Sequence, residues 1–240
     1  MFSEYLLLIV FLSVAMYLSV RFKKLTVAAS LTGGLLSILI FAGCGYYPLV
    51  LMATFFILGS AATSWKIKTK QSLGLAELNK GKRGSSQVLA NAMVAAIIGV
   101  IAYFYPAQKE TFNLMIAAAF SSATADTLSS ELGNIYGKKF YNIVTLKKDK
   151  RGLNGVISLK GTLFGIAGSF IIALIYAIKS GLIFKNIIII VLAGTIGNLA
   201  DSLIGATAER KNLLNNNSVN FLNTLIASLV CLLLVNIFES

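Results

Sequence analysis

Eight long apolar runs dominate the chain, and they restrict its fold more than any other feature. The runs are Tyr5–Val20, Leu25–Phe41, Tyr47–Thr63, Gln87–Tyr105, Phe112–Tyr136, Val156–Ile178, Ile187–Ala208 and Asn220–Phe238. A helix needs about 20 residues to cross the ~30 Å hydrocarbon core of a bilayer, and most of the runs approach that length. We therefore predict an all-α integral membrane protein, in which residues 1–240 form a single transmembrane domain, a bundle of about eight transmembrane helices.

The composition supports a membrane protein and excludes several kinds of chemistry. Hydrophobic residues make up 57% of the chain and charged residues 12%, whereas a soluble domain has about 45–50% and about 25%. The chain has no histidine, which excludes histidine catalysis and histidine metal sites. Cys44 and Cys231 both fall in apolar runs, where we expect them to pack as small core residues.

The basic residues predict the orientation of the bundle. With the N-terminus outside the cell membrane, the inner loops are 21–24, 64–86, 137–155 and 209–219, and they hold 17 of the 21 Lys and Arg residues. An excess of Lys and Arg in cytosolic loops is the usual rule for multi-pass proteins. The two longer basic loops, about 64–86 and 137–155, are thus expected in the cytosol. Topology accounts for the net charge of +12, so no nucleic-acid partner is expected.

Carboxylates gather at the predicted inner ends of two helices. Asp126 and Glu131 lie in SSATADTLSSELG at the end of the fifth run, and Asp201, with Asn198 on the same face, lies near the end of the seventh. Acids in membrane helices are costly and mark functional sites by default. Glu131 is five residues from Asp126, so it points to a different side unless the helix ends early, near Gly133.

Two packed helices bearing Asp126 and Asp201 are suited to binding Mg²⁺, which takes one or two carboxylates together with water and substrate phosphate. Two alternatives remain open: a buried carboxylate paired with a lysine, or the proton relay of a transporter. Asn91 is also polar at membrane depth. It either faces the same site or forms an interhelical hydrogen bond.

The loop Lys138–Gly155 combines cations with a Gly-x-x-Gly ending that leads directly into the next helix. Backbone amides at a helix start, with nearby Lys and Arg, suit a polyphosphate. Basic inner loops also bind anionic lipid, which is the alternative. The segment Tyr141–Leu146 contains β-branched residues and is expected to form a short strand or hairpin.

Five motifs occur in the order typical of one membrane family. The motifs are GKRGSSQVLANA, SSATADTLSSELG, GLNGVISLKGT, GNLADSLIGATAE and NNNSVNFLNT. Over roughly residues 25–235 the chain resembles the family named domain of unknown function ninety-two, which includes the plant phytyl-phosphate kinase and an animal transmembrane protein. The block Asp126–Gly165 also resembles the core of CTP-dependent polyprenol and dolichol kinases.

This resemblance implies phosphoryl transfer from a nucleoside triphosphate, with CTP expected, to an isoprenyl monophosphate such as phytyl phosphate. It implies acidic site residues at Asp126, Glu131 and Asp201, and a nucleotide-side turn at Gly152, Gly155, Ser158, Gly161 and Thr162. Asn91 and Asn220 match polar positions of the family. Lys160, Asn154 and Glu209 depart from its pattern.

Together these observations predict a Mg²⁺-dependent membrane kinase with its site at the cytosolic face. Asp126 and Asp201 are expected to bind the metal, with Glu131 positioning the metal or the attacking phosphate. The cations expected to neutralise the triphosphate are Lys147, Lys148 and Arg151. The expected partners are a nucleoside triphosphate, an isoprenyl-phosphate lipid and membrane lipids, with no oligomeric state indicated. An ion- or proton-coupled transporter or flippase using the same acids is the main alternative, and a lipid-binding scaffold is another.

Overall fold

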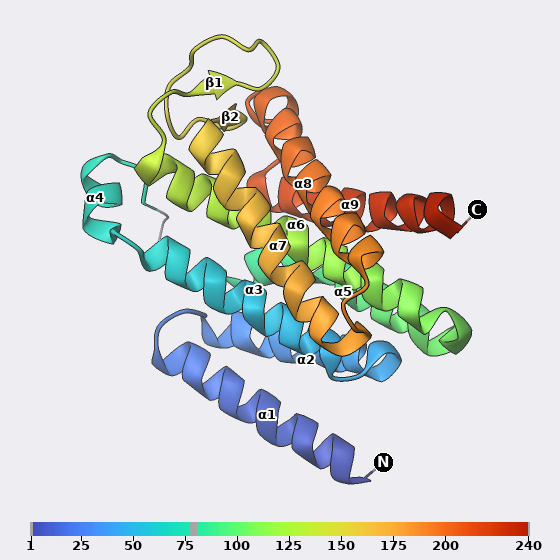
Figure 1. Cartoon of the computed structure of the whole chain (residues 1–240). Coiled ribbons are helices and arrows are strands. Elements are labelled where there is room, and N and C mark those ends of the chain that lie inside the picture. Colours follow the sequence, from blue (N-terminus) through green and yellow to red (C-terminus); the bar gives the residue numbers. More distant parts are fainter. Residues whose placement is uncertain (1, 77–80, 240) are drawn as a thin grey trace.

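Helices form almost all of the regular structure in the computed structural model, which describes residues 2–76 and 81–239, with side chains for 5–76 and 81–238 (Figure 1). The elements are α1 (Phe2–Arg21), α2 (Val27–Cys44), α3 (Tyr47–Ser64), α4 (Ile67–Ser72), α5 (Ser85–Phe104), the 3₁₀ turn η2 (Pro106–Gln108), α6 (Lys109–Tyr136), β1 (Tyr141–Asn142), β2 (Val156–Ile157), α7 (Leu159–Ser180), α8 (Phe184–Ile204), the π turn η3 (Gly205–Glu209) and α9 (Asn216–Glu239).

The long helices α1, α2, α3, α5, α6, α7, α8 and α9 coincide with the eight predicted runs, apart from small shifts at their ends. In the described part of the chain, six helices are long and apolar enough to cross a membrane, and α1 adds a shorter apolar stretch, Tyr5–Arg21. The all-α membrane bundle is thus confirmed, although six helices rather than eight meet the requirement for a span. α6 is not one of the six.

Two helices, α2 and α7, begin later than the apolar runs predict, because a side chain caps each of them. α2 begins at Val27 rather than at Leu25, because the side chain of Thr26 caps the helix by accepting a hydrogen bond from the Ala29 N–H at 3.0 Å. The sixth run begins with β2, so α7 starts only after Ser158, which caps it through the Gly161 N–H at 3.1 Å. Side-chain caps of this kind fix a helix start where hydrophobicity alone does not.

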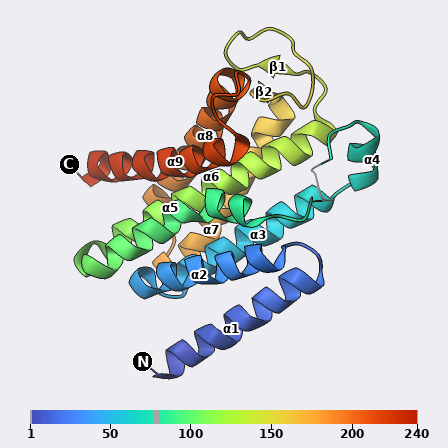
Figure 2. The same cartoon turned by 180° about the vertical axis from the view of Figure 1, so that it is seen from behind.

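α6 is the central helix of the bundle. It packs against α3, α5, α7, α8 and α9, and the two opposite views in Figures 1 and 2 show it running through the middle of these helices. Asn113, Ser121, Ser122 and Thr124 of α6 are all buried. Because neighbouring helices separate it from lipid, α6 accommodates polar residues that a lipid-facing helix would not.

Glycines bring α7 close to α6. A Cβ atom added at Gly161 would lie 2.9 Å from the Ser129 carbonyl oxygen, and one at Gly165 would lie 3.1 Å from the Ala125 carbonyl oxygen. Both distances are shorter than ordinary van der Waals contact. The packing role expected of small residues in membrane helices therefore applies to this pair.

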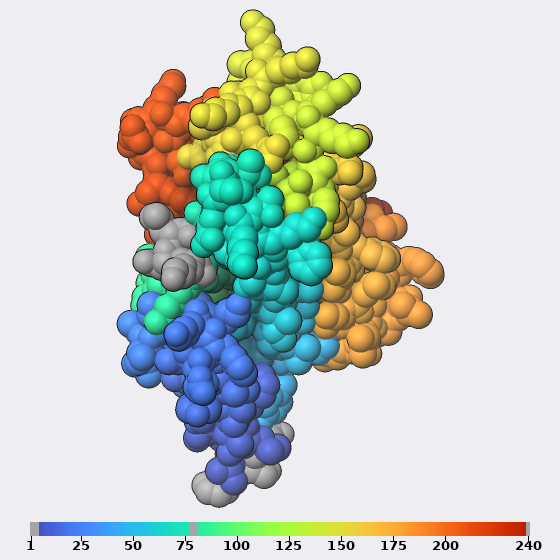
Figure 3. Space-filling model, turned by 90° about the vertical axis from the view of Figure 1, so that its left-hand side faces the viewer, coloured from blue at the N-terminus to red at the C-terminus, as the bar shows by residue number. Residues whose placement is uncertain are grey.

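Four connections meet at one end of the bundle, which we call the loop end. They are the turn 22–26, the described parts of 65–84, the loop 137–158 and the turn 210–215 (Figure 3). The Lys24 ammonium donates a hydrogen bond to the Ser64 hydroxyl at 2.6 Å, and the Thr26 N–H donates to the Arg83 carbonyl at 3.1 Å. Both termini lie on the other side of the molecule (Figure 1).

The loop 137–158 contains the only strands within residues 2–76 and 81–239. β1 pairs with β2 in an antiparallel arrangement, with Tyr141 opposite Ile157. The strand expected in Tyr141–Leu146 is therefore confirmed for its first two residues, and its partner lies just before α7. This pairing brings the end of the loop back over the bundle.

Candidate functional site

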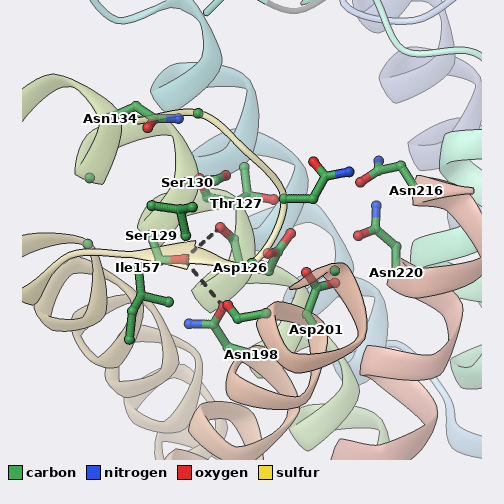
Figure 4. Close-up of a pocket in the computed structure, with 18 of the residues that line it drawn as sticks. Asp126, Thr127, Ser129, Ser130, Asn134, Ile157, Asn198, Asp201, Asn216 and Asn220 are labelled. Atoms are coloured by element: carbon green, nitrogen blue, oxygen red, sulfur yellow. Dashed lines mark hydrogen bonds between the residues drawn. The ribbon is translucent and has the colours of Figure 1, made fainter. Parts of the chain in front are cut away.

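A polar cavity of about 220 Å³ opens at the loop end (Figure 4). The ends of α6 and α8, the starts of α5, α7 and α9, and the second half of the loop 137–158 all contribute to its walls. Ten of the residues singled out from the sequence line it: Asn91, Asp126, Gly152, Gly155, Ser158, Gly161, Thr162, Asn198, Asp201 and Asn220. Their convergence was expected because the helices that carry them all end or begin on the same side.

Asp126 of α6 and Asp201 of α8 face one another across the cavity (Figure 4). The two carboxyl groups lie close enough to influence each other electrostatically, and the Glu209 carboxylate adds a further negative charge near Asp201. The Asn223 amide of α9 donates to Asp201 Oδ2 at 3.3 Å. Two carboxylates at this separation repel each other when both are ionised, which favours a shared proton or a bound cation.

Hydrogen bonds on the surrounding helices hold these acids in place. The Ser129 hydroxyl lies 3.0 Å from the Asp126 carbonyl oxygen and 3.3 Å from Asn198 Oδ1. Asn223, which binds Asp201, is itself buried and accepts a hydrogen bond from the Ser122 hydroxyl. The two acids therefore project from α6 and α8, which are hydrogen-bonded to each other and to α9, and this limits the movement of their side chains.

The turn 152–158 forms the wall of the cavity on the loop side. Gly152 and Gly155 have positive φ angles of 81° and 71°, a backbone conformation that other residues rarely adopt. Gly155 lies against η3, the π turn that ends α8. A five-residue π turn of this kind is uncommon and is often found at functional sites.

Arg210 fastens this loop to the end of α8. Its Nε donates to the Asn154 carbonyl at 2.6 Å, and its guanidinium pairs with Asp149 at 2.8 Å. The pKa of Asp149 lies below its ordinary value, firstly because its carboxylate accepts a hydrogen bond from the Lys150 N–H and secondly because of Arg210. The carboxylate therefore stays ionised, and the contact stays intact, at neutral pH.

Residues before and within the start of α5 form another wall. Arg83 is buried, and its guanidinium lies 5.2 Å from the centre of the Phe55 ring. Gln87 and Asn91 follow one and two turns into the helix. Gln87 accepts a hydrogen bond from the Gly84 N–H at 3.0 Å, and the Asn91 amide donates to the Gln87 carbonyl at 2.8 Å. Asn91 thus lines the cavity, which agrees with the prediction that it faces the site rather than forming an interhelical hydrogen bond.

Glu131 lies outside the cavity. α6 continues to Tyr136 rather than ending near Gly133, so Glu131 points away from Asp126. It is buried and pairs with Lys70 of α4, a side chain that is only 1% exposed. Glu131 is therefore a buried carboxylate paired with a lysine, which was one of the alternatives left open by the sequence. It does not lie in the cavity where it was expected to position the metal.

The three basic residues expected to face the triphosphate also lie outside the cavity. Lys147 and Lys148 are exposed on the outer half of the loop. Arg151 donates to the Asn134 carbonyl at 3.1 Å and lies over the Phe140 ring, so it holds the loop against the end of α6. The pairing of β1 with β2 directs the glycine turn, rather than these cations, toward the acids.

The donors around the two acids fit Mg²⁺ that is shared with a phosphate. Among the described residues, no group of three or more His, Cys, Asp and Glu could hold a metal ion by itself. The cavity offers the carboxylates of Asp126 and Asp201, with amide oxygens from asparagines beside them. Mg²⁺ prefers oxygen donors and usually completes its coordination with water and substrate phosphates.

Sequence reasoning missed several residues of the cavity. Arg83 stood in the motif GKRGSSQ but was interpreted only as part of a basic loop. Asn216 lies one turn before Asn220 on α9, a four-residue spacing that could have identified it. Ser129 and Asn134 also line the cavity. Of the three residues that depart from the family pattern, Asn154 and Glu209 line the cavity and Lys160 is exposed.

Comparison with known proteins identifies the family. A profile described as "Integral membrane protein DUF92" matches residues 10–228. The chain belongs to this family. The resemblance found in the five motifs is therefore confirmed, and the protein is a multi-pass integral membrane protein.

Relatives in plants, bacteria and archaea share most of the chain. It is 34% identical to protein VTE6, chloroplastic, of Arabidopsis thaliana over 83% of this chain and 62% of the relative. An uncharacterised membrane protein of Synechocystis sp. is 35% identical, with 82% and 77% covered. Another, from Methanocaldococcus jannaschii, is 35% identical, with 80% and 77% covered. The chain thus spans less than two thirds of VTE6. No solved structure matches.

Proposed function

We propose that the protein is a membrane kinase that transfers a phosphoryl group from a nucleoside triphosphate, preferably CTP, to an isoprenyl monophosphate. The observation that carries the proposal is the pair of facing carboxylates, Asp126 and Asp201, in a polar cavity at the loop end. The resemblance of the five motifs to a family that includes the plant phytyl-phosphate kinase supports the same substrate class.

Phosphoryl transfer depends on positioning and on charge stabilisation rather than on covalent chemistry by the protein. Mg²⁺ held by Asp126 and Asp201 would neutralise the phosphates, so that two acids and two anionic substrates can share one cavity. The requirement for a divalent cation is part of the proposal. It explains why acids, rather than a cluster of bases, line a site for anions.

The chain's own residues have positioning roles in this scheme. Gly152 and Gly155 allow the turn to approach a phosphate closely through its backbone. Asn198 of α8 and Asn220 of α9 line the cavity near the two acids (Figure 4). The acceptor is a monophosphate that is already ionised at neutral pH, so no strong general base is needed. The absence of histidine from the chain is compatible with this chemistry.

The proposed orientation puts the loop end in the cytosol and the N-terminus outside the cell membrane. The loop end carries most of the Lys and Arg residues, in keeping with the positive-inside rule. A cytosolic site would have direct access to nucleoside triphosphates.

The position of the cavity favours a kinase over the transporter or flippase. Transporter sites usually lie near the bilayer midplane, where discontinuous helices meet. Here helix ends and a loop form the walls, and all of them belong to the loop end. A kinase requires access from the donor side only, which fits this placement.

The test uses purified protein in lipid nanodiscs with Mg²⁺, CTP or ATP labelled in the γ-phosphate, and a series of prenyl monophosphates. We expect label to move into an organic-soluble prenyl diphosphate, and both Asp126→Asn and Asp201→Asn to lose this transfer. Glu110→Gln is the matched control, because Glu110 is an exposed acid of α6 that pairs with Lys179 far from the cavity. Failure to transfer to any acceptor, together with Asp126-dependent ion uptake into vesicles, would instead establish the transporter.

A further inference from the structure

A second cavity, of about 140 Å³, lies between α1, α2, α3 and α5. Most of its wall surface is apolar. The apolar side chains include Leu12, Met16, Leu49, Met52, Phe56 and Val88. We call it the apolar cavity. The mechanism described above makes no use of it.

The few polar residues in these walls do not make the cavity polar. The Ser37 hydroxyl donates to the Gly33 carbonyl at 2.7 Å, and the Ser19 hydroxyl donates to the Met16 carbonyl at 2.8 Å. Both hydroxyls are therefore satisfied by the backbone of their own helices. What remains available to a guest is hydrocarbon and the two flexible methionine side chains, which adapt to irregular apolar shapes.

The apolar cavity adjoins the polar one. Arg83, Gln87 and Asn91 line both cavities. A single molecule can therefore lie with an apolar chain between α1, α2 and α3 and an anionic head beside the start of α5. Arg83 stands at this junction, with its guanidinium packed over Phe55 of the apolar wall.

α1 lies between the apolar cavity and the outer surface of the bundle. α1 forms the outer wall, through residues that include Phe11 and Ala15, and it lies at the edge of the bundle beside α2 (Figures 1 and 2). Phe11 remains 47% exposed, on a face made of other exposed apolar side chains. An apolar chain entering from the bilayer on this side would pass along or beneath α1, whose outward face is apolar.

We propose that the apolar cavity binds the isoprenyl tail of the acceptor, with Arg83 facing its phosphate and directing it toward Asp126 and Asp201. The proposal rests on the kinase function and adds to it a location for the tail and a reason for chain-length preference. A tail held in this cavity gains affinity with each carbon that it buries away from water. A headgroup alone would bind far more weakly.

The test fills the apolar cavity while leaving the acids untouched. Ala53 lines it from α3, so Ala53→Phe should occupy space that the tail needs. Ala61→Phe makes the same change at an exposed position of α3 away from both cavities and serves as the control. Binding of dimethylallyl, geranyl, farnesyl and geranylgeranyl monophosphate to the full chain in nanodiscs is measured by titration without nucleotide.

For the unmodified protein and for Ala61→Phe, affinity should rise with tail length until the tail fills the cavity. Ala53→Phe should weaken geranylgeranyl monophosphate by about tenfold or more, equivalent to roughly 1.4 kcal/mol, and leave dimethylallyl monophosphate nearly unchanged. A photoreactive geranylgeranyl monophosphate should crosslink to α1, α2 or α3, and unlabelled ligand should compete. If Ala53→Phe does not fold, Gly33→Leu replaces it, because a Cβ at Gly33 meets only Val88, at 3.7 Å.

The outcomes separate the two proposals. If prenyl phosphates are phosphorylated but the tail-length dependence is the same in Ala53→Phe and Ala61→Phe, the location of the tail is wrong and the kinase stands. If no phosphate is transferred but tail-dependent binding and crosslinking persist, the kinase is wrong and the tail site stands. Crosslinks confined to α7 or α8 would also overturn the tail site.

Discussion

The central helix α6 takes part in two acidic contacts of opposite character. At one, Glu131 and Lys70 form a buried ion pair, and the Lys70 ammonium also donates to the Ala62 carbonyl at 2.7 Å. At the other, Asp126 meets a second acid, Asp201, in a cavity open to ligands. Five residues along a helix correspond to about 140° around its axis, so the two acids of one motif serve different neighbours.

The difference shows how to distinguish a structural acid from a ligand-binding one in this bundle. Lys70 satisfies Glu131 and the last carbonyl groups of α3 at once, since it also lies 3.2 Å from the Thr63 carbonyl oxygen. Such a contact joins α3, α4 and α6 and leaves little for a ligand to add. The pair Asp126–Asp201 becomes more favourable when a cation or proton joins it.

The largest expected effect on activity belongs to the ligand-binding acids. Asp126→Asn or Asp201→Asn should lower kcat by about a thousandfold, because a metal-held phosphate loses several kcal/mol of charge stabilisation. Stability should stay equal or rise, since like charges are removed. Phosphoryl-transfer kinetics and the thermal unfolding midpoint are measured on the same preparations. If either variant were less stable than the parent protein but kept its full activity, the acid that it replaces would be structural rather than ligand-binding.

The largest expected effect on stability belongs to the ion pair. Lys70→Met leaves Glu131 buried without its partner and should cost about 3–5 kcal/mol of unfolding free energy. The double variant Lys70→Met/Glu131→Leu should recover most of that loss, because it removes both charges. Denaturant unfolding in detergent micelles measures both. If Glu131→Gln instead abolished transfer in a protein of normal stability, Glu131 would belong with the site after all.

A smaller effect is expected at the contact that holds the loop. Arg210→Gln removes the ion pair with Asp149 and the bond to the Asn154 carbonyl, so the glycine turn should be less well placed. We expect a several-fold higher KM for the nucleotide with a nearly unchanged kcat. Lys211→Gln removes a neighbouring charge of the same sign and should leave both constants unchanged. Equal changes in the two variants would mean that only overall charge matters.

The smallest effect concerns pH. The pKa of Asp149 is lowered in the folded state, so its contribution is fully present above the ordinary carboxyl pKa and is lost as the pH falls through the lowered value. Cleavage of the loop by an acid-tolerant protease should therefore stay slow from neutral pH to mildly acidic pH and accelerate only below the usual carboxyl range. Asp149→Asn should cleave quickly at every pH. A rise in cleavage near neutrality in the parent protein would contradict this assignment.

Much of the site could be predicted from the sequence because it depends on topology. Apolar length set the helices, and the basic loops set their direction. The direction alone brings Asp126 and Asp201 to one depth, since α6 and α8 both run toward the loop end. The glycines at 152 and 155 were also recognisable, because few other residues serve in such a turn.

What could not be predicted depends on contacts between distant segments. Lys70 lies in a six-residue helix whose short, polar and basic sequence, IKTKQS, could equally belong to a loop. Its pairing with Glu131 follows only from the packing of α4 against α6. Likewise, the orientation of Lys147 and Lys148 depends on β1, β2 and Arg210, which fix the loop from elsewhere in the chain.

The π turn at the end of α8 has a consequence for how the chain tolerates changes in length. Gly205–Glu209 contains one residue more than an α-helical turn needs. Loss of Thr207 would therefore allow α8 to continue as a regular helix, and the membrane bundle would remain intact. The residues that follow would keep nearly the same position around the helix axis, because the wide turn already absorbs one extra residue, and Arg210 would stay beside the loop. A deletion of one residue in the regular part of α8 has the opposite effect, because it turns every later residue by about 100° and carries Arg210 away from Asp149 and Asn154.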